Sequence, residues 1–254
     1  MIARKPVKAG HGLCRIVGVI TNRSELRNAA RMQHPPDLFE LRLDHLVERE
    51  EEVKKTIPTL RVPIIITARH PREGGANNLT IHQRRDLLLR FLPTAKYVDV
   101  ELRSAKQLSS VLDLARKRKI RRILSFHDFR STPTSGTLHA KARAAKLMGA
   151  DVFKIATRTD MPAQLTRLLE FVGQQDAEMS IAAMGIGKLG AVSRVALAQS
   201  GSALIYASIG RGRVEGQLSL DHFRAALDAS GNVPFAPVSF AKEYARLLRS
   251  EDRR

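Results

Sequence analysis

A lysine interrupts a short apolar segment of this 254-residue chain, Val152–Ile155. Most lysines in predicted strands lie on a solvated edge, because an ammonium ion is costly to remove from water. This segment, however, lies between two predicted helices, Leu138–Met148 and Pro162–Val172. A strand between two helices is typical of a parallel sheet that is covered on both faces. Lys154 would then point inward as a reactive amine, the group that forms Schiff bases with ketones.

A second reactive group precedes this lysine by one predicted strand. His127 lies in the segment Ser125-Phe126-His127-Asp128-Phe129, directly after an apolar stretch. An imidazole with an ordinary pKa of about 6.5 can accept and donate protons at neutral pH. A lone histidine after a strand is more often structural, but its position one strand before Lys154 favours a role in acid–base chemistry.

These residues need a scaffold that brings strand ends together, and the sequence predicts one. Eight apolar segments are predicted as strands: Cys14–Thr21, Leu38–Leu43, Val62–Arg69, Tyr97–Glu101, Arg122–Phe126, Val152–Ile155, Ile181–Met184 and Ala203–Ala207. They alternate with predicted helices at Ser24–Met32, Glu48–Thr56, Ile81–Leu92, Lys106–Arg118, Leu138–Met148, Pro162–Val172, Ser193–Ser200 and from about Ser219 to Leu227. Eight such alternations predict an α/β fold, a single-domain (β/α)8 barrel over residues 1–254, with a short basic helix or tail from about Pro234. Such barrels carry their functional groups at the C-terminal ends of the strands.

The composition restricts the classes of function. No apolar run approaches the ~20 residues that a membrane-spanning helix needs. The single cysteine, Cys14, excludes an internal disulfide framework, and we expect a cytoplasmic protein. No group of His, Cys and Asp has the spacing of metal ligands, so we predict no metal.

The net charge of +18 is the one compositional anomaly of the chain. Such a charge often indicates a nucleic-acid or anionic-surface partner. The densest basic run, Ala115–Arg122, closes an amphipathic helix, where cations favour the negative end of the helix dipole. Tryptophan is absent, and no nucleic-acid-binding module is recognisable. We therefore predict a solvated basic face and no nucleic-acid partner.

Seven short motifs lie in order at the predicted strand ends. They are Glu40-Leu41-Arg42-Leu43-Asp44, Thr67-Ala68-Arg69 with Glu73-Gly74-Gly75, Asp99-Val100-Glu101, Ser125-Phe126-His127-Asp128-Phe129, Phe153-Lys154-Ile155-Ala156, Met184-Gly185 with Ser193-Arg194, and Gly216-Gln217. Through them the chain resembles type I 3-dehydroquinate dehydratase over about residues 16–219. The resemblance implies a lyase of the shikimate pathway that converts 3-dehydroquinate to 3-dehydroshikimate without a cofactor, and a homodimer.

The resemblance also implies catalytic roles. Lys154 forms an imine with the substrate ketone, which acts as an electron sink. His127 is the general acid and base, and Glu73 orients and stabilises its imidazolium form. We expect burial and nearby arginines to increase the neutral fraction of the Lys154 amine.

Substrate-binding roles follow from the same resemblance. Arg194 is expected to hold the substrate carboxylate through the fork of its guanidinium, with Gln217 adding a hydrogen bond. Glu40, Arg42 and Arg69 are expected to hold the ring hydroxyls and the ketone region. Met184 is expected to form an apolar wall over the ring.

One loop departs from the family pattern. Family members often have Ser-Ala-Pro-Gly-Gln before the last helix, with the serine touching the substrate. Alignment back from Gln217 places Arg213 at this serine and Glu215 at the proline. We expect the loop to close over the substrate as a lid, with Arg211 or Arg213 reaching the carboxylate.

Two other interpretations remain open at this point. Another Schiff-base barrel lyase, such as a class I aldolase, would share Lys154 but would have no particular need for the His127–Glu73 pair. A nonenzymatic barrel that binds anions or RNA would explain the positive charge.

Overall fold

The computed structural model describes residues 8–9, 12–174, 179–210, 212 and 214–230. Its centre is a ring of eight parallel strands: β3 (Arg15–Ile20), β4 (Leu38–Arg42), β5 (Ile64–Thr67), β6 (Tyr97–Glu101), β7 (Arg121–Asp128), β8 (Val152–Arg158), β9 (Ser180–Ile186) and β10 (Leu204–Ser208). Each strand is hydrogen-bonded to the next in the order β10, β3, β4, β5, β6, β7, β8 and β9. The Ala203 N–H donates to the Ile181 carbonyl at 2.8 Å and joins the two ends of the sheet.

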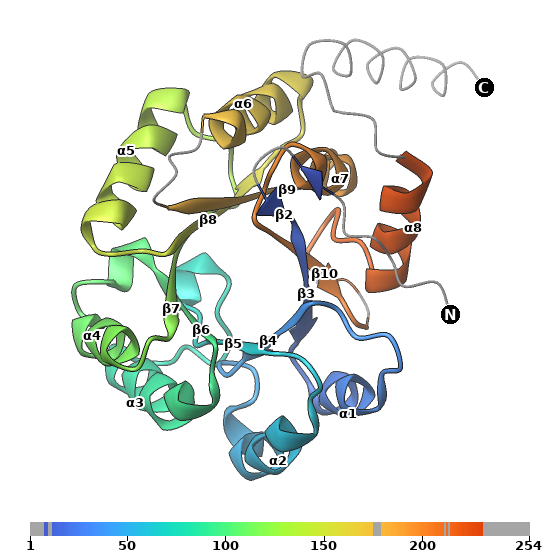
Figure 1. The fold of residues 1–254 in the computed structure, drawn as a ribbon. Helices are drawn as coiled ribbons and strands as arrows, with labels where there is room; N and C mark the ends of the chain where they lie inside the picture. Colours follow the sequence, from blue (N-terminus) through green and yellow to red (C-terminus); the bar gives the residue numbers. More distant parts are fainter. Residues whose placement is uncertain (1–7, 10–11, 175–178, 211, 213, 231–254) are drawn as a thin grey trace.

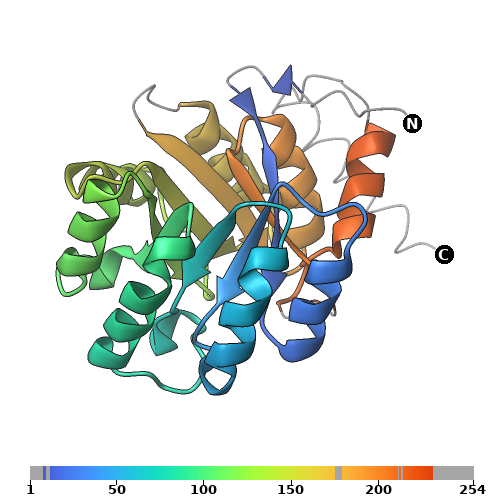
Figure 2. The ribbon, with the colours of Figure 1, turned by 60° about the horizontal axis from the view of Figure 1, so that its bottom comes forward.

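The helices form an outer ring around these strands (Figure 1). They are α1 (Arg23–Arg31), α2 (Glu50–Thr56), α3 (Ile81–Phe91), α4 (Ser109–Lys117), α5 (Ser135–Leu147), α6 (Pro162–Gly173), α7 (Gly190–Gln199) and α8 (Leu220–Ser230). Seen from the side, they run alongside the tilted strands (Figure 2). The fold is the predicted (β/α)8 barrel.

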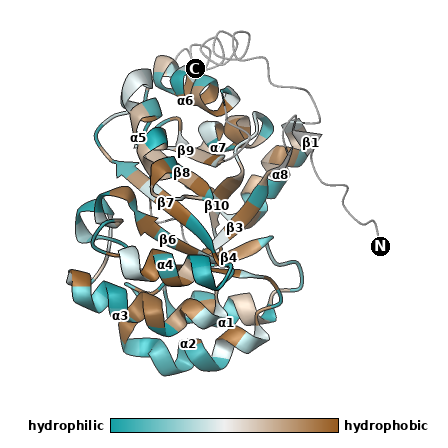
Figure 3. Ribbon diagram, turned by 60° about the vertical axis from the view of Figure 1, so that its left-hand side comes forward, coloured by the Kyte–Doolittle hydropathy of each residue, from teal (hydrophilic) through white to brown (hydrophobic). Residues whose placement is uncertain are grey.

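Apolar side chains separate into two layers, because neighbouring residues of a strand point to opposite faces. One layer lies between the strands and the helices, and a smaller one fills the inside of the barrel. The strands are therefore largely hydrophobic, whereas the helices turn hydrophilic residues outward (Figure 3). In β8, Val152 and Ala156 belong to the inner layer and Phe153 and Ile155 to the outer one. Lys154 thus shares the inward face with Val152 and Ala156.

Three strands extend two or three residues further toward the C-terminal end of the barrel than predicted. β7 continues to Asp128, β8 to Arg158 and β9 to Ile186. The end predicted for β7 was too early because the polar side chains of His127 and Asp128 stop the apolar pattern, whereas the backbone ladder continues. His127 pairs with Ala156, for example, and so belongs to a strand rather than to a loop.

Two regions differ from the prediction in other ways. A hairpin of two very short strands, β1 (Lys8–Ala9) and β2 (Gly12–Leu13), precedes the barrel and was not predicted, because two residues show no periodicity. The predicted final helix, 234–254, lies outside the described residues. No helix in the described part of the chain has the length and apolar character to cross a membrane.

Candidate active site

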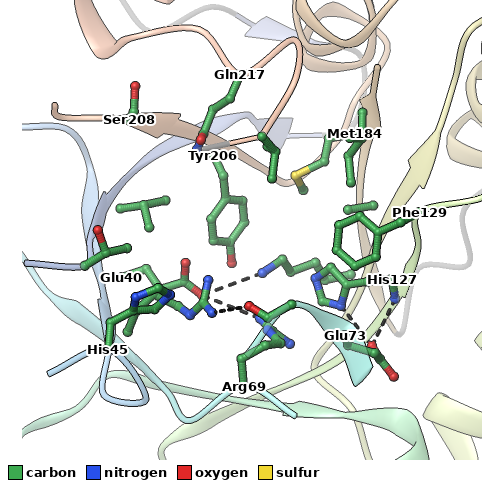
Figure 4. Close-up of a pocket in the computed structure, with 18 of the residues that line it drawn as sticks. Glu40, His45, Arg69, Glu73, His127, Phe129, Met184, Tyr206, Ser208 and Gln217 are labelled. Carbon is green, nitrogen blue, oxygen red and sulfur yellow. Dashed lines mark hydrogen bonds and ion pairs between the residues drawn. The ribbon is translucent and has the colours of Figure 1, made fainter. Parts of the chain in front are cut away.

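A cavity of about 370 Å³ opens at the C-terminal ends of the strands (Figure 4). Nine of the ten predicted site residues line it: Glu40, Arg42, Arg69, Glu73, His127, Lys154, Met184, Arg194 and Gln217. The tenth, Arg213, lies outside the described residues, as does Arg211. The barrel therefore brings together groups that are up to 177 positions apart in the sequence, from Glu40 to Gln217.

Lys154 lies on the inner face of β8, and only 4% of the residue is exposed. Its Nζ is 2.9 Å from Asp99 Oδ2 and 3.7 Å from Glu40 Oε1. Its ion-pair partners are carboxylates, and Arg69, one of the arginines expected nearby, contacts the same two oxygen atoms at 2.9 and 3.7 Å. Burial alone would raise the pKa of Asp99, but Arg69 and Lys154 hold that pKa well below its usual range. Asp99 is therefore an anion beside the Lys154 nitrogen.

His127 faces the same cavity from β7, and Glu73 binds it. The carboxylate Oε2 of Glu73 is 2.9 Å from His127 Nδ1 and accepts a hydrogen bond from the His127 backbone N–H at 3.1 Å. This contact fixes the direction of the ring and leaves Nε2 as the atom available to a substrate. The predicted pairing of the two residues is confirmed.

The surroundings change the acidity of both partners. Burial, followed by the positive charges of Arg69 and Lys154, lowers the pKa of His127 well below its ordinary value. Burial, followed by the negative charge of Glu101, raises the pKa of Glu73 to about 7. The imidazole is therefore neutral at pH 7 and can accept a proton. The Glu73 carboxyl becomes an anion as the pH rises through about 7.

The segment that carries Glu73 is held by a bidentate ion pair. Arg42 donates to both carboxylate oxygens of Asp44, at 3.0 and 2.8 Å, and to the Gly74 carbonyl at 2.9 Å. Gly74 adopts φ +82°, and a Cβ there would lie 3.2 Å from the Phe129 ring. Arg42 thus positions the Glu73 turn, in addition to lining the cavity where we expected it to bind substrate.

Arg69 is almost fully committed to the protein. Its Nη1 donates to Asp99, Glu101 and Ser125, and its Nη2 donates to Asp99. Although burial opposes its charge, Asp99 and Glu101 raise the pKa of Arg69 well above its usual value. The guanidinium also approaches Glu40 Oε1 at 3.7 Å. Arg69 therefore links the carboxylates that surround Lys154.

Arg194, in the second turn of α7, is a buried cation whose contacts are backbone carbonyls. It donates to the carbonyls of Gly185, Gly190 and Gly216 at 2.7 to 2.9 Å, and to that of Tyr206 at 3.3 Å. Only 2% of the residue is exposed, and within the described residues no carboxylate forms an ion pair with it. Burial lowers its pKa to about 10. A bound anion would supply the missing counter-charge.

Sequence reasoning did not identify several residues of the cavity wall. Tyr206 of β10 is buried, with the Lys154 ammonium 3.9 Å from the centre of its ring. Phe129 is 41% exposed and stacks beside His127, with ring centres 6.4 Å apart. His45 also lines the cavity. Phe129 is the last residue of the motif that contains His127, so its position in the sequence could have identified it as a residue of the site. Among the described residues, no three His, Cys, Asp or Glu side chains are grouped to hold a metal ion.

Comparison with known proteins identifies the family. Residues 13–234 match the sequence profile described as type I 3-dehydroquinase. The chain belongs to the type I 3-dehydroquinase family. A family member from Methanothermobacter thermautotrophicus, named 3-dehydroquinate dehydratase, is 36% identical over 187 residues, which cover 73% of this chain and 81% of that protein. A relative of the same name from Shouchella clausii is 31% identical over 207 residues, covering 76% of this chain and 80% of the relative.

Solved structures of type I 3-dehydroquinases and their relatives share the fold. The 3-dehydroquinate dehydratase of Geobacillus kaustophilus superposes with a TM-score of 0.77 at 28% identity, covering 87% of this chain and 93% of that one. The type I enzyme of Clostridium difficile gives 0.76 at 25% identity, covering 91% and 98%. A putative aldolase domain from Bacteroides vulgatus gives only 0.60 at 15% identity, covering 93% and 87%, and shares the barrel alone.

Proposed function

We propose that this protein catalyses the dehydration of 3-dehydroquinate to 3-dehydroshikimate through a Schiff base on Lys154. The observation that carries the proposal is the grouping of three features around one cavity. These are the buried amine of Lys154, the neutral imidazole of His127 with Glu73 behind it, and the buried Arg194 without an ion-pair partner among the described residues. The names of the relatives support the same reaction.

Imine formation is the first chemical stage. Lys154 loses a proton to His127 and attacks the C3 ketone carbon, and the resulting carbinolamine loses water as His127 returns the proton. The product is a protonated imine, whose positive nitrogen can accept the electron pair of a neighbouring C–H bond. Asp99 remains beside the nitrogen as an anion and stabilises its positive charge.

Elimination follows at the adjacent carbons. His127 Nε2 removes a proton from C2, and the electron pair moves into an enamine. The enamine then expels the C1 hydroxyl, to which the imidazolium of His127 donates the proton, so that one water leaves. Hydrolysis of the new imine returns the Lys154 amine and releases 3-dehydroshikimate. Glu73 keeps the ring oriented and stabilises its charged form during these transfers.

The walls of the cavity suit the substrate. The proposal places the substrate carboxylate against Arg194, where it neutralises a buried charge, with Gln217 at the same end. The ring hydroxyls then face Glu40 and Arg42, and Met184 covers the ring. Arg213, at the position of the family serine, would contribute from the loop when it closes.

A spectroscopic assay tests this function. The product contains a carbon–carbon double bond conjugated to the ketone, so near-ultraviolet absorbance should rise when the protein is mixed with 3-dehydroquinate. The matched control is Lys154→Ala, which should give no rise while keeping its circular dichroism spectrum. Absence of product with the wild-type protein would contradict the proposal, and an active alanine variant would remove the imine mechanism.

Two further parts of the proposal concern the assembly, which rests on the family resemblance, and the location, which rests on cysteine usage. We propose a homodimer, which light scattering after size-exclusion chromatography tests; a monomer at assay concentration would contradict it. We also propose a cytoplasmic location. The single Cys14 is compatible with a reducing compartment, and burial raises the pKa of its thiol to about 12, so the thiol is unreactive.

A further inference from the structure

The hydroxyl of Tyr206 is a buried polar group without a hydrogen-bond partner in the described part of the chain. Tyr206 itself is 4% exposed and belongs to the inner layer of the barrel. A buried hydroxyl that makes no hydrogen bond destabilises the folded state, whereas phenylalanine would fill the same space without that cost. The hydroxyl therefore needs an explanation outside the folding of the barrel.

The position of the hydroxyl points to a ligand. Tyr206 lines the cavity, and the Lys154 ammonium lies 3.9 Å from the centre of its ring. Figure 4 shows the hydroxyl directed toward the end of the cavity where Glu40 and Arg69 lie. The hydroxyl thus belongs to a ring that lies against the nitrogen that a substrate carbonyl must approach.

Tyr97, at the start of β6 and in the same inner layer, shows how a tyrosine hydroxyl is satisfied when its role is structural. Its hydroxyl accepts hydrogen bonds from the guanidinium groups of Arg15 and Arg121. Both guanidinium groups also lie over its ring, at 5.3 and 5.5 Å from the centre. The two tyrosines thus share the inner layer. The described part of the protein supplies hydrogen-bond partners for the hydroxyl of Tyr97 and none for that of Tyr206.

We propose that Tyr206 binds the substrate. Its hydroxyl donates a hydrogen bond to the substrate oxygen on the carbon adjacent to the carbonyl that Lys154 attacks. In 3-dehydroquinate this oxygen is the C4 hydroxyl. The inference rests on the proposed function and adds a binding residue to it. The bond orients the ketone toward the amine, while the ring keeps its contact with the ammonium, a contact that phenylalanine would preserve.

Tyr206→Phe tests the proposal because it removes only the hydroxyl. Without substrate, its melting temperature should equal or exceed that of the wild type, since an unpartnered polar group is lost. With 3-dehydroquinate, KM should rise roughly threefold to tenfold, the range of one neutral hydrogen bond, with kcat changed by less than about twofold. Tyr97→Phe is the matched control, which should melt at a lower temperature and keep the wild-type KM.

Each other result overturns the inference. An unchanged KM in Tyr206→Phe, with an active wild type, shows that the hydroxyl does not contact substrate and leaves the dehydratase proposal standing. A fall in melting temperature comparable to that of Tyr97→Phe shows that the hydroxyl has a structural partner. An inactive wild type refutes the dehydratase proposal, and the role of Tyr206 falls with it.

Discussion

Replacing Glu73 by glutamine should change how the stability of the protein depends on pH. Glutamine keeps the shape of the side chain and an oxygen that can accept the hydrogen bond from the His127 backbone N–H, but it cannot ionise. In the wild type, burial and the nearby Glu101 raise the pKa of Glu73 from 4.5 to about 7. The folded state therefore binds more protons than the unfolded chain between these pH values. The contribution of Glu73 to stability is greatest below about pH 4.5 and declines as the pH rises toward 7.

The pKa values set the size of the effect. At about 1.36 kcal/mol per unit, their difference corresponds to about 3 kcal/mol of lost stability once the pH exceeds both. About 2.5 kcal/mol of this loss falls between pH 5 and pH 8. The Glu73→Gln variant avoids the loss, so its stability relative to the wild type should increase by about 2.5 kcal/mol from pH 5 to pH 8.

Urea unfolding at pH 5, 6.5 and 8 measures this difference. Glu48→Gln is the matched control, because Glu48 is an exposed carboxylate away from the cavity, and its difference from the wild type should stay constant. A Glu73→Gln variant whose difference from the wild type is also constant with pH would refute the claim that Glu73 titrates near neutrality in the folded state.

Two other variants separate the proposed roles. His127→Ala should form an imine that borohydride can trap, but more slowly, because water must replace the imidazole in the proton transfers of that stage. Its kcat should fall by at least ~100-fold because proton transfer in the elimination is lost; a kcat like that of the wild type would place the base elsewhere. Arg194→Gln should raise KM by at least ~10-fold through loss of a charged hydrogen bond to the carboxylate, and should lower the melting temperature because four carbonyls lose a strong donor. An unchanged KM in that variant would remove the carboxylate clamp.

The sequence was sufficient to predict the barrel and the direction of Lys154. Eight alternations of strand and helix predicted the architecture. Lys154 is two positions from both Val152 and Ala156, so its side chain lies on the same face of the strand as theirs. Both conclusions depend on the order of elements and on alternation, which a sequence contains. The pairing of His127 with Glu73 was implied by the family resemblance, and the structure places the two side chains in contact.

The partners of each charge were not predictable in the same way. Asp99 of β6 reaches Lys154 of β8 past the strand between them, β7. The curvature of the closed barrel brings the Lys154 Nζ to 2.9 Å from the Asp99 Oδ2. The carbonyls around Arg194 are backbone atoms, which carry no sequence signal. Tyr206 was missed because both faces of β10 are buried, so its apolar pattern does not reveal which side chains point inward.

Borohydride trapping tests the central claim most directly. The protein is mixed with 3-dehydroquinate and sodium borohydride, its intact mass is measured, and any modified peptide is sequenced. We predict one adduct, located on Lys154, and conjugated product when borohydride is omitted. No adduct and no product, or an adduct on another residue, would contradict the Schiff-base dehydratase proposed for this barrel.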